Sequence, residues 1–142
     1  MAKKSATSST IPGTIPTELP GLASYEVNMA DWPHSWMGSE KDIVPGQHLV
    51  HCFESFCERL LTTPLTRKTV HKHINNLWLL GGEVIRDLNE DGKLRKIPID
   101  QLLLQTLDEE GGPLIHNGSE EEQRSFDSTC RKLYRFLADP LR

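Results

Sequence analysis

The sequence predicts an all-α protein: a small helical bundle of about four main helices, preceded by an irregular N-terminal segment. Apolar residues recur at steps of three and four along several segments, which places them on one face of a helix. Polar capping residues and prolines stand where these patterns begin or stop. With 142 residues, the chain has the length of one domain with a core of its own.

Residues 1–24 are rich in Ser, Thr, Pro and Gly. Such a composition buries little apolar surface, so we expect a flexible tail here and a single helical domain over residues 25–142. The side chains expected to dock the tail locally are Leu19, Leu22 and Tyr25.

Residues 25–46 contain Trp32 and Trp36 among several Pro and Gly residues. Two tryptophans in an irregular segment indicate that the segment lies against the domain and completes its core. The alternative is an exposed aromatic docking patch for a partner or a base.

The first main helix is expected over residues 47–61, because Leu49, Phe53 and Leu60 have helical spacing and Pro45 suits a helix start. It should stop near Pro64. A metal site is one interpretation of the histidines and cysteines in this stretch, but their spacing matches no known zinc motif. We expect core cysteines and surface histidines at these positions: His48, His51, Cys52 and Cys57.

A second helix should begin after Thr66, a good N-cap with Leu65 as the hydrophobic staple. The glycine pair at 81–82 costs about 1 kcal/mol per residue inside a helix. Because the apolar spacing continues through it, we favour one long helix ending near Asn89, with another element packed closely on the glycines. The alternative ends the helix at the glycines and forms a hairpin over residues 83–99.

Two further helices complete the prediction. A short one should run from residue 98 or 99 to 107 and end at the Gly- and Pro-rich break over 109–113. The last should begin at the capping box formed by Ser119 and Glu122 and end near Leu137.

The formal net charge of −4 argues against a general nucleic-acid binder. The charge is uneven, however: residues 67–96 hold seven Lys or Arg against four acids, and residues 100–127 hold eight acids against one Arg. Three cysteines without a CxxC pair predict no disulfide framework and favour the cytoplasm. We expect no membrane span, and the N-terminus has no apolar segment of a secretory signal.

The polar side of the second predicted helix combines cations with amides. Amides can bind base edges, and cations can bind phosphates. We therefore hypothesise that this helix binds duplex DNA; the alternative is an ordinary solvated polar face. The proposed DNA-binding residues on this helix are Arg67, Lys68, His71, Lys72, Asn75 and Asn76.

The order of the helices, with the segments Leu65-Thr-Arg-Lys-Thr-Val70, Ile97-Pro-Ile-Asp-Gln-Leu-Leu103 and Leu133-Tyr-Arg-Phe-Leu137, resembles the N-terminal core-binding domain of tyrosine recombinases and phage integrases. The resemblance covers roughly residues 47–137. It implies that the domain clamps one side of a duplex, with four cations near DNA: Arg67, Lys68, Lys72 and Arg131. The paired arginines, His-x-x-Arg box and nucleophilic tyrosine of that family's catalytic domain are not matched.

Two other functions fit the sequence. One is a protein-interaction or accessory module of a mobile-element system, using the acidic stretch 108–122 and the Trp32–Met37 cluster as its surfaces, with a protein partner or a homodimer. The other is a winged-helix regulator with its wing at 83–99. No catalytic, metal or cofactor motif appears with its expected structural setting, so we expect no enzyme and no cofactor.

Overall fold

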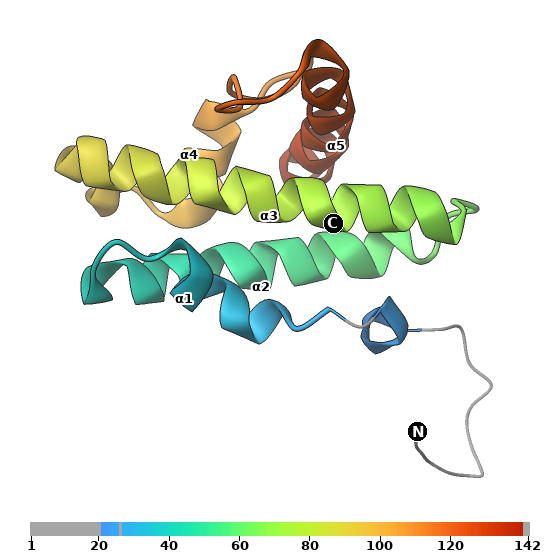
Figure 1. Ribbon diagram of the computed structural model, residues 1–142, viewed down its shortest axis with the longest axis horizontal. Coiled ribbons are helices and arrows are strands. Elements are labelled where there is room, and N and C mark those ends of the chain that lie inside the picture. Colours follow the sequence, from blue (N-terminus) through green and yellow to red (C-terminus); the bar gives the residue numbers. More distant parts are fainter. Residues whose placement is uncertain (1–20, 26, 141–142) are drawn as a thin grey trace, which may run out of the picture.

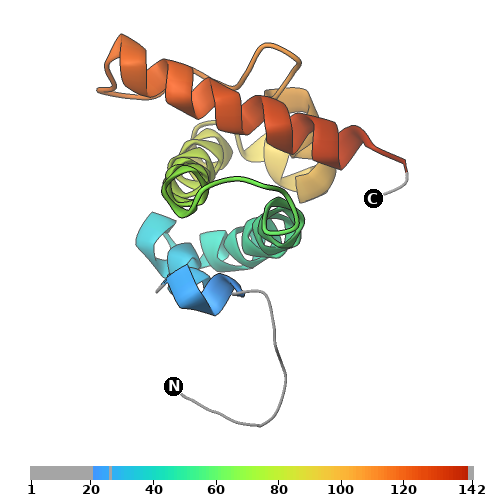
Figure 2. The same cartoon turned by 90° about the vertical axis from the view of Figure 1, so that its right-hand side faces the viewer.

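The computed structural model describes residues 21–25 and 27–140, and these confirm an all-α bundle. The two longest helices, α2 (Ile43–Leu60) and α3 (Arg67–Glu90), lie side by side and run in opposite directions (Figure 1). The short helix α1 (Trp32–Trp36) lies on one side of this pair. Helices α4 (Ile99–Thr106) and α5 (Glu120–Ala138) lie on the other side, and α5 crosses α3 (Figures 1 and 2).

Helix α3 occupies the middle of the bundle. Seen along its axis in Figure 2, it lies between α2 and α5, and it contacts α1, α2 and α5. A helix with neighbours on several sides buries more than one stripe of side chains. Its buried apolar residues are Val70, Ile74, Leu77, Leu80, Val84, Ile85 and Leu88.

The prediction of one long helix through the glycine pair is confirmed. Thr66 caps α3 by accepting a hydrogen bond from the backbone N–H of Thr69 at 3.2 Å. Trp36 is the element packed on the glycines, because a Cβ at Gly81 would lie only 2.0 Å from its ring. The hairpin alternative is wrong: residues 83–90 continue α3, and Gly92–Lys96 forms a 3-10 helix, so no wing is present at 83–99.

The other helix boundaries lie close to their predicted positions. Helix α2 begins at Ile43 rather than 47, because a 3-10 turn over Glu40–Asp42 leads directly into it. The Asp42 carboxylate caps that turn, since its Oδ2 accepts a hydrogen bond from the backbone N–H of Ser39 at 3.2 Å. The predicted capping box of α5 is confirmed, with Ser119 and Glu122 bonding each other's backbone N–H groups.

The N-terminal segment is more regular than expected. Residues 1–20 of the predicted tail lie outside the described residues, and Leu22–Tyr25 forms a 3-10 helix with Tyr25 buried. Met29–Asp31 forms another 3-10 turn that leads into α1, where Pro33 suits the first turn.

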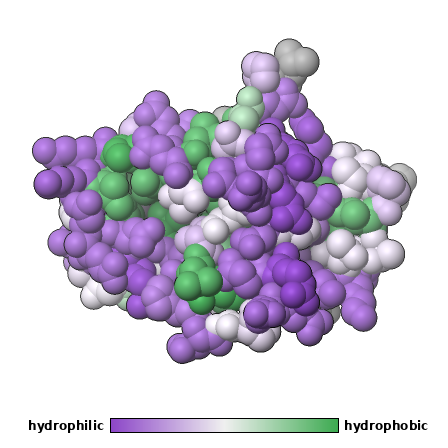
Figure 3. Space-filling model, turned by 90° about the horizontal axis from the view of Figure 1, so that it is seen from above, coloured by the Kyte–Doolittle hydropathy of each residue, from purple (hydrophilic) through white to green (hydrophobic). Residues whose placement is uncertain are grey.

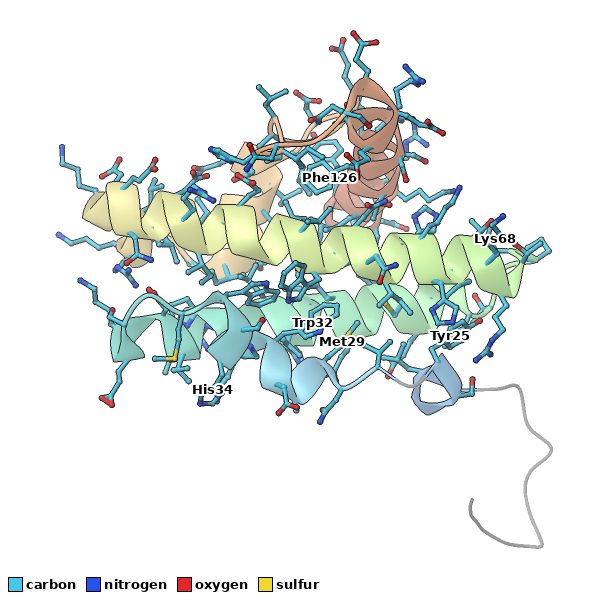
Figure 4. The ribbon with its side chains drawn as sticks, in the orientation of Figure 1. Tyr25, Met29, Trp32, His34, Lys68 and Phe126 are labelled. Carbon is cyan, nitrogen blue, oxygen red and sulfur yellow. The ribbon has the colours of Figure 1, made fainter. Side chains whose placement is uncertain are left out.

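Trp32 and Trp36 pack against the bundle, as predicted. Their rings lie 6.4 and 6.3 Å from that of Phe53 on α2. Figure 4 shows Trp32 and Met29 directed from the N-terminal segment toward the α2 and α3 pair, whereas His34 points away. The aromatic segment therefore completes the core.

The face of the molecule seen from above is mostly hydrophilic (Figure 3). Seen from above α5, hydrophobic residues form separate patches among hydrophilic ones (Figure 3). Across residues 21–25 and 27–140, no helix has both the length and the apolar character needed to cross a membrane.

Candidate functional site

The proposed DNA-binding residues of α3 point in three directions. Arg67 and His71 turn toward the N-terminal segment. The guanidinium of Arg67 lies 4.3 Å from the ring centroid of Tyr25, and its Nη2 donates a hydrogen bond to the carbonyl O of Ser24. The His71 ring meets the edge of the same Tyr25 ring at 4.8 Å. These two side chains therefore anchor residues 24–25 onto α3.

Asn76 does not lie on an exposed face, so that expectation is wrong. Its side chain is 8% exposed and points toward α5. The amide Nδ2 donates to Oγ1 of Thr129 at 2.9 Å and to the carbonyl O of Ser125 at 3.1 Å. The Asn76 amide is thus used in helix packing, because α5 covers the side of α3 that the sequence pattern left open.

A buried histidine belongs to the same network. His73 Nδ1 lies 2.6 Å from Oγ1 of Thr129. Burial lowers the pKa of His73, and the charge of Lys132 lowers it further. The imidazole is therefore held in its neutral form between α3 and α5.

Arg131 lies on α5 and is half-buried. Its Nη1 donates a hydrogen bond to the carbonyl O of Glu110 at 3.2 Å, which ties α5 to the preceding loop. Arg131 therefore lies on α5 and contacts the loop before it. The other proposed DNA-binding residues lie on α3.

The remaining residues do share one face. Lys68, Lys72 and Asn75 are exposed, and they follow each other at steps of four and three along α3. Leu79 and Arg86 continue the same line, and Trp78 lies at its edge. We call this set the α3 surface: Lys68, Lys72, Asn75, Trp78, Leu79 and Arg86.

Trp78 and Leu79, which were not among the predicted site residues, form the apolar centre of the α3 surface. They are 41% and 37% exposed. The ring of Trp78 is fixed by a hydrogen bond from Nε1 to Oγ of Ser35 at 2.9 Å. The carbonyl O of Trp78 accepts a second bond, from Nε1 of Trp36 at 2.9 Å. The sequence held one signal: residues 77–80 are all apolar, and they cannot all face the same side of a helix.

Two surface hollows meet at Trp78 and Leu79. The first, about 540 Å³, is bounded by the N-terminal segment through Val27 and Trp32 and by Ile74 of α3. The second, about 570 Å³, extends along α3 past Gly82 and Ile85 to Asn89, and the loop at His116 and Asn117 borders it. Together the hollows make a groove along the outward side of α3, which we call the α3 groove.

Charges of both signs border the α3 groove: Arg86 and Glu83 line the second hollow, and the half-buried Asp87 interacts electrostatically with both. Lys68, Lys72 and Arg86 form no salt bridge with any residue that the structure describes. The nearby carboxylate of Glu83 already has a partner, because both its oxygens lie 3.0 Å from Nδ1 of His116. The exposed Glu90 lies one turn beyond Arg86, at the end of α3.

The histidines and cysteines of α2 lie elsewhere. His48, His51 and Cys52 border a hollow of about 360 Å³ together with Asp100. No group of three or more potential metal ligands, within the part of the chain that the structure describes, is arranged to hold an ion. Cys57 is a core residue, as predicted: burial raises the pKa of its thiol to about 12, with a further rise from Glu54 and Glu58.

The α3 groove combines an exposed aromatic ring (Trp78), an exposed leucine (Leu79), an amide (Asn75) and the guanidinium of Arg86. The hydroxyl-bearing Ser35 and the paired Glu83 and His116 also line its second hollow. Comparisons of the chain with protein-family models, with curated proteins and with solved structures found no match.

Proposed function

We propose that this protein is a non-enzymatic binding module that docks a segment of a partner protein in the α3 groove. The observation that carries this proposal is the adjacent exposure of Trp78 and Leu79, at the meeting point of two hollows. Tryptophan is among the residues that most often dominate binding energy at protein interfaces. An exposed Trp-Leu pair on a rigid helix is therefore best explained by a partner that covers it.

The rigidity of Trp78 supports the same function. Its indole N–H is bonded to Ser35, and its backbone carbonyl is bonded to Trp36. A side chain that is already fixed in place loses little conformational entropy when a partner binds. The α3 groove therefore has the preorganised aromatic anchor that favours tight association.

Photo-crosslinking tests this function in cells of the protein's natural source. A benzoylphenylalanine residue replaces Leu79 in the α3 groove or, as a matched control, replaces the exposed His34, which points away from the helices. We expect an adduct with one defined protein from position 79 and none from position 34. Trp78→Ala should remove the adduct, and the identified protein should bind the purified chain directly.

Three outcomes contradict the proposal. Equal crosslinking from both positions would mean that the groove has no special role. An adduct that nuclease removes would indicate a nucleic acid instead. An adduct of twice the chain's mass would identify a second copy of this chain as the occupant.

Duplex DNA binding is the second candidate, favoured by one observation: Lys68, Lys72 and Asn75 project together from α3. The resemblance to a recombinase core-binding domain points the same way, toward an accessory role in a mobile-element system. A mobility-shift assay at low salt tests it. Lys68→Glu with Lys72→Glu should abolish the complex and its salt dependence, whereas Lys41→Glu with Lys93→Glu should preserve it. No complex with the unaltered chain would rule this candidate out.

The cytoplasm is the compartment we propose for this module. Cys57 and Cys130 are free thiols in the core, a state that a reducing compartment maintains. Alkylation of the protein in intact cells, before and after unfolding, would reveal whether these thiols are reduced there.

A further inference from the structure

Asn117 and Gly118 form the one Asn-Gly pair of the sequence, in the loop that leads into α5. The side-chain amide of an asparagine can be attacked by the backbone nitrogen of the residue that follows it. Glycine hinders this attack least, because it has no Cβ. Asparagine is also one of the thermolabile residues of proteins. The pair could therefore undergo a covalent change that needs no enzyme.

The fold favours this pair at this point of the loop. The backbone at Asn117 lies in the left-handed region, with φ 62°. Asparagine is one of the few residues besides glycine that adopt this region readily. A Cβ at Gly118 would lie only 2.4 Å from Cδ1 of Ile115, so a larger residue there would have to displace the Ile115 side chain.

The Asn117 amide is free to react. The residue is exposed, and its side chain forms no hydrogen bond with any residue that the structure describes. Gly118 lies before the first turn of α5, which begins at Glu120, so no helix holds its backbone in place. Both the attacked group and the attacking nitrogen therefore lie on an exposed loop.

The four other asparagines of the chain are held in place. Three of them donate their side-chain amides to other residues at 2.9–3.0 Å: Asn28, Asn76 and Asn89. The fourth, Asn75, is exposed, but it lies inside α3. In a helix the N–H of the following residue is hydrogen-bonded and directed along the axis, so it cannot reach the side chain before it.

We propose that Asn117 is a site of spontaneous deamidation. The backbone nitrogen of Gly118 loses its proton to solvent and bonds to Cγ of Asn117. The bond between Cγ and Nδ2 breaks, and ammonia leaves after it takes up a proton. Water then opens the resulting five-membered ring at either carbonyl, which gives aspartate or isoaspartate at position 117.

The product changes the border of the second hollow, where Asn117 lies beside the pair formed by His116 and Glu83. Either product has a carboxylate that is ionised at neutral pH, so the loop gains one negative charge. Isoaspartate also adds a methylene group to the backbone. The inference is independent of the proposed protein-binding function, because the reaction needs only the loop and water.

Ageing of the purified full chain in mildly alkaline buffer, followed by trypsin digestion and mass spectrometry, tests the proposal. Cleavage after Lys96 and Arg124 gives a peptide, residues 97–124, that contains Asn117 and no other asparagine. Its mass should rise by about one dalton as OH replaces NH2. An isoaspartate-specific methyltransferase should label part of the product. The change should slow in mildly acidic buffer, because the attacking nitrogen must lose its proton.

The same digest contains an internal reference, the peptide of residues 73–86, which carries Asn75 and Asn76. We expect the 97–124 peptide to change at least about tenfold faster, because α3 must open locally before either of these asparagines can react.

Two variants identify the reacting groups. Asn117→Gly removes the amide but keeps the left-handed backbone without strain, so its 97–124 peptide should keep its mass. Gly118→Ala places a methyl group beside the attacking nitrogen and should slow the change. Circular dichroism shows whether each variant is folded.

Four results would overturn the proposal: no mass increase in the 97–124 peptide, an equal rate in the 73–86 peptide, an increase that persists in Asn117→Gly, and a product without isoaspartate. None of them bears on the crosslink at position 79, which tests the protein-binding function separately.

Discussion

The indole ring of Trp36 lies directly on Gly81, so that α1 and α3 meet where α3 has no side chain. A Cβ on Gly81 would approach Cζ2 of Trp36 to 2.0 Å, a distance that real Cβ atoms do not reach. The neighbouring Gly82 differs, since its Cβ would lie 3.6 Å from the same ring, in ordinary contact. The two glycines therefore have different roles although they are adjacent.

Opposite stability changes are expected for alanine at these two positions. Gly81→Ala should lower the free energy of unfolding by about 1–3 kcal/mol, because the ring must move, and this outweighs the better helix propensity of alanine. Gly82→Ala should raise it by about 0.5–1 kcal/mol through helix propensity alone. Urea denaturation of both variants checks the pair. A stabilising Gly81→Ala would show that Trp36 does not pack as described.

Adjacent asparagines of α3 should also differ. Asn76→Ala removes a buried side chain whose amide donates to Thr129 and Ser125 across the contact between α3 and α5, so it should cost about 1–3 kcal/mol. Asn75→Ala, on the exposed α3 surface, should change stability by less than about 0.5 kcal/mol. Chemical denaturation compares the two. Equal effects would contradict the assignment of Asn76 to the contact between α3 and α5.

The buried carboxylate of Asp42 should make stability depend on acid pH. Burial alone would raise the pKa of Asp42, but hydrogen bonds from Asn89, Arg95 and the backbone N–H groups of Gly38 and Ser39 lower it from 3.8 to about 2. Because the folded-state pKa lies below the unfolded value, the stabilisation is present above pH ~4 and is lost as the pH falls toward 2.

Asp42→Asn tests this dependence. In the unaltered chain the shift corresponds to about 2 kcal/mol lost between about pH 5 and pH 2. In the variant, the fall in the free energy of unfolding over this range should be smaller by about that amount. Urea midpoints at several pH values measure it. A variant with the same pH profile as the unaltered chain would contradict a charged Asp42 bonded to Arg95.

His73 should also make the stability of the protein depend on pH, in a range nearer to neutral. Burial, helped by the charge of Lys132, lowers the pKa of His73 below its usual 6.5. The unfolded chain therefore binds this proton more readily, so the stabilisation is present above about pH 6.5 and is lost as the pH falls below it. His73→Gln should flatten the change in stability between about pH 7.5 and 5.5. An unchanged slope in denaturation experiments would show that His73 is not the group responsible.

The helices of this bundle could be predicted because their signals are local. The apolar spacing from Val70 to Leu88 continues through the glycines, and Thr66 and Ser119 are capping residues within one turn of the groups they bond. The close approach at Gly81 was also predicted, because a glycine in the apolar phase of a helix makes room for a neighbour.

The directions of individual α3 side chains could not be predicted, because they depend on distant parts of the chain. Asn76 is buried since α5, about fifty residues later, crosses that side of α3. Arg67 is held by Tyr25 of the N-terminal segment. Trp78 is exposed because α1 and α2 already occupy the apolar sides of α3. Helical periodicity predicts which side chains share a face of a helix. It does not predict how many of those faces neighbouring helices will cover.

Chemical-shift mapping of the isotope-labelled full chain, with the crosslinked partner added, tests the central claim most directly. The three indole N–H signals can be assigned by replacing each tryptophan with phenylalanine in turn. The α3 groove predicts that the Trp78 indole and the backbone amides from Lys68 to Arg86 shift most, together with those near Val27 and His116. Changes confined to the hollow at His48 and Asp100, or to the outer side of α5, would contradict it.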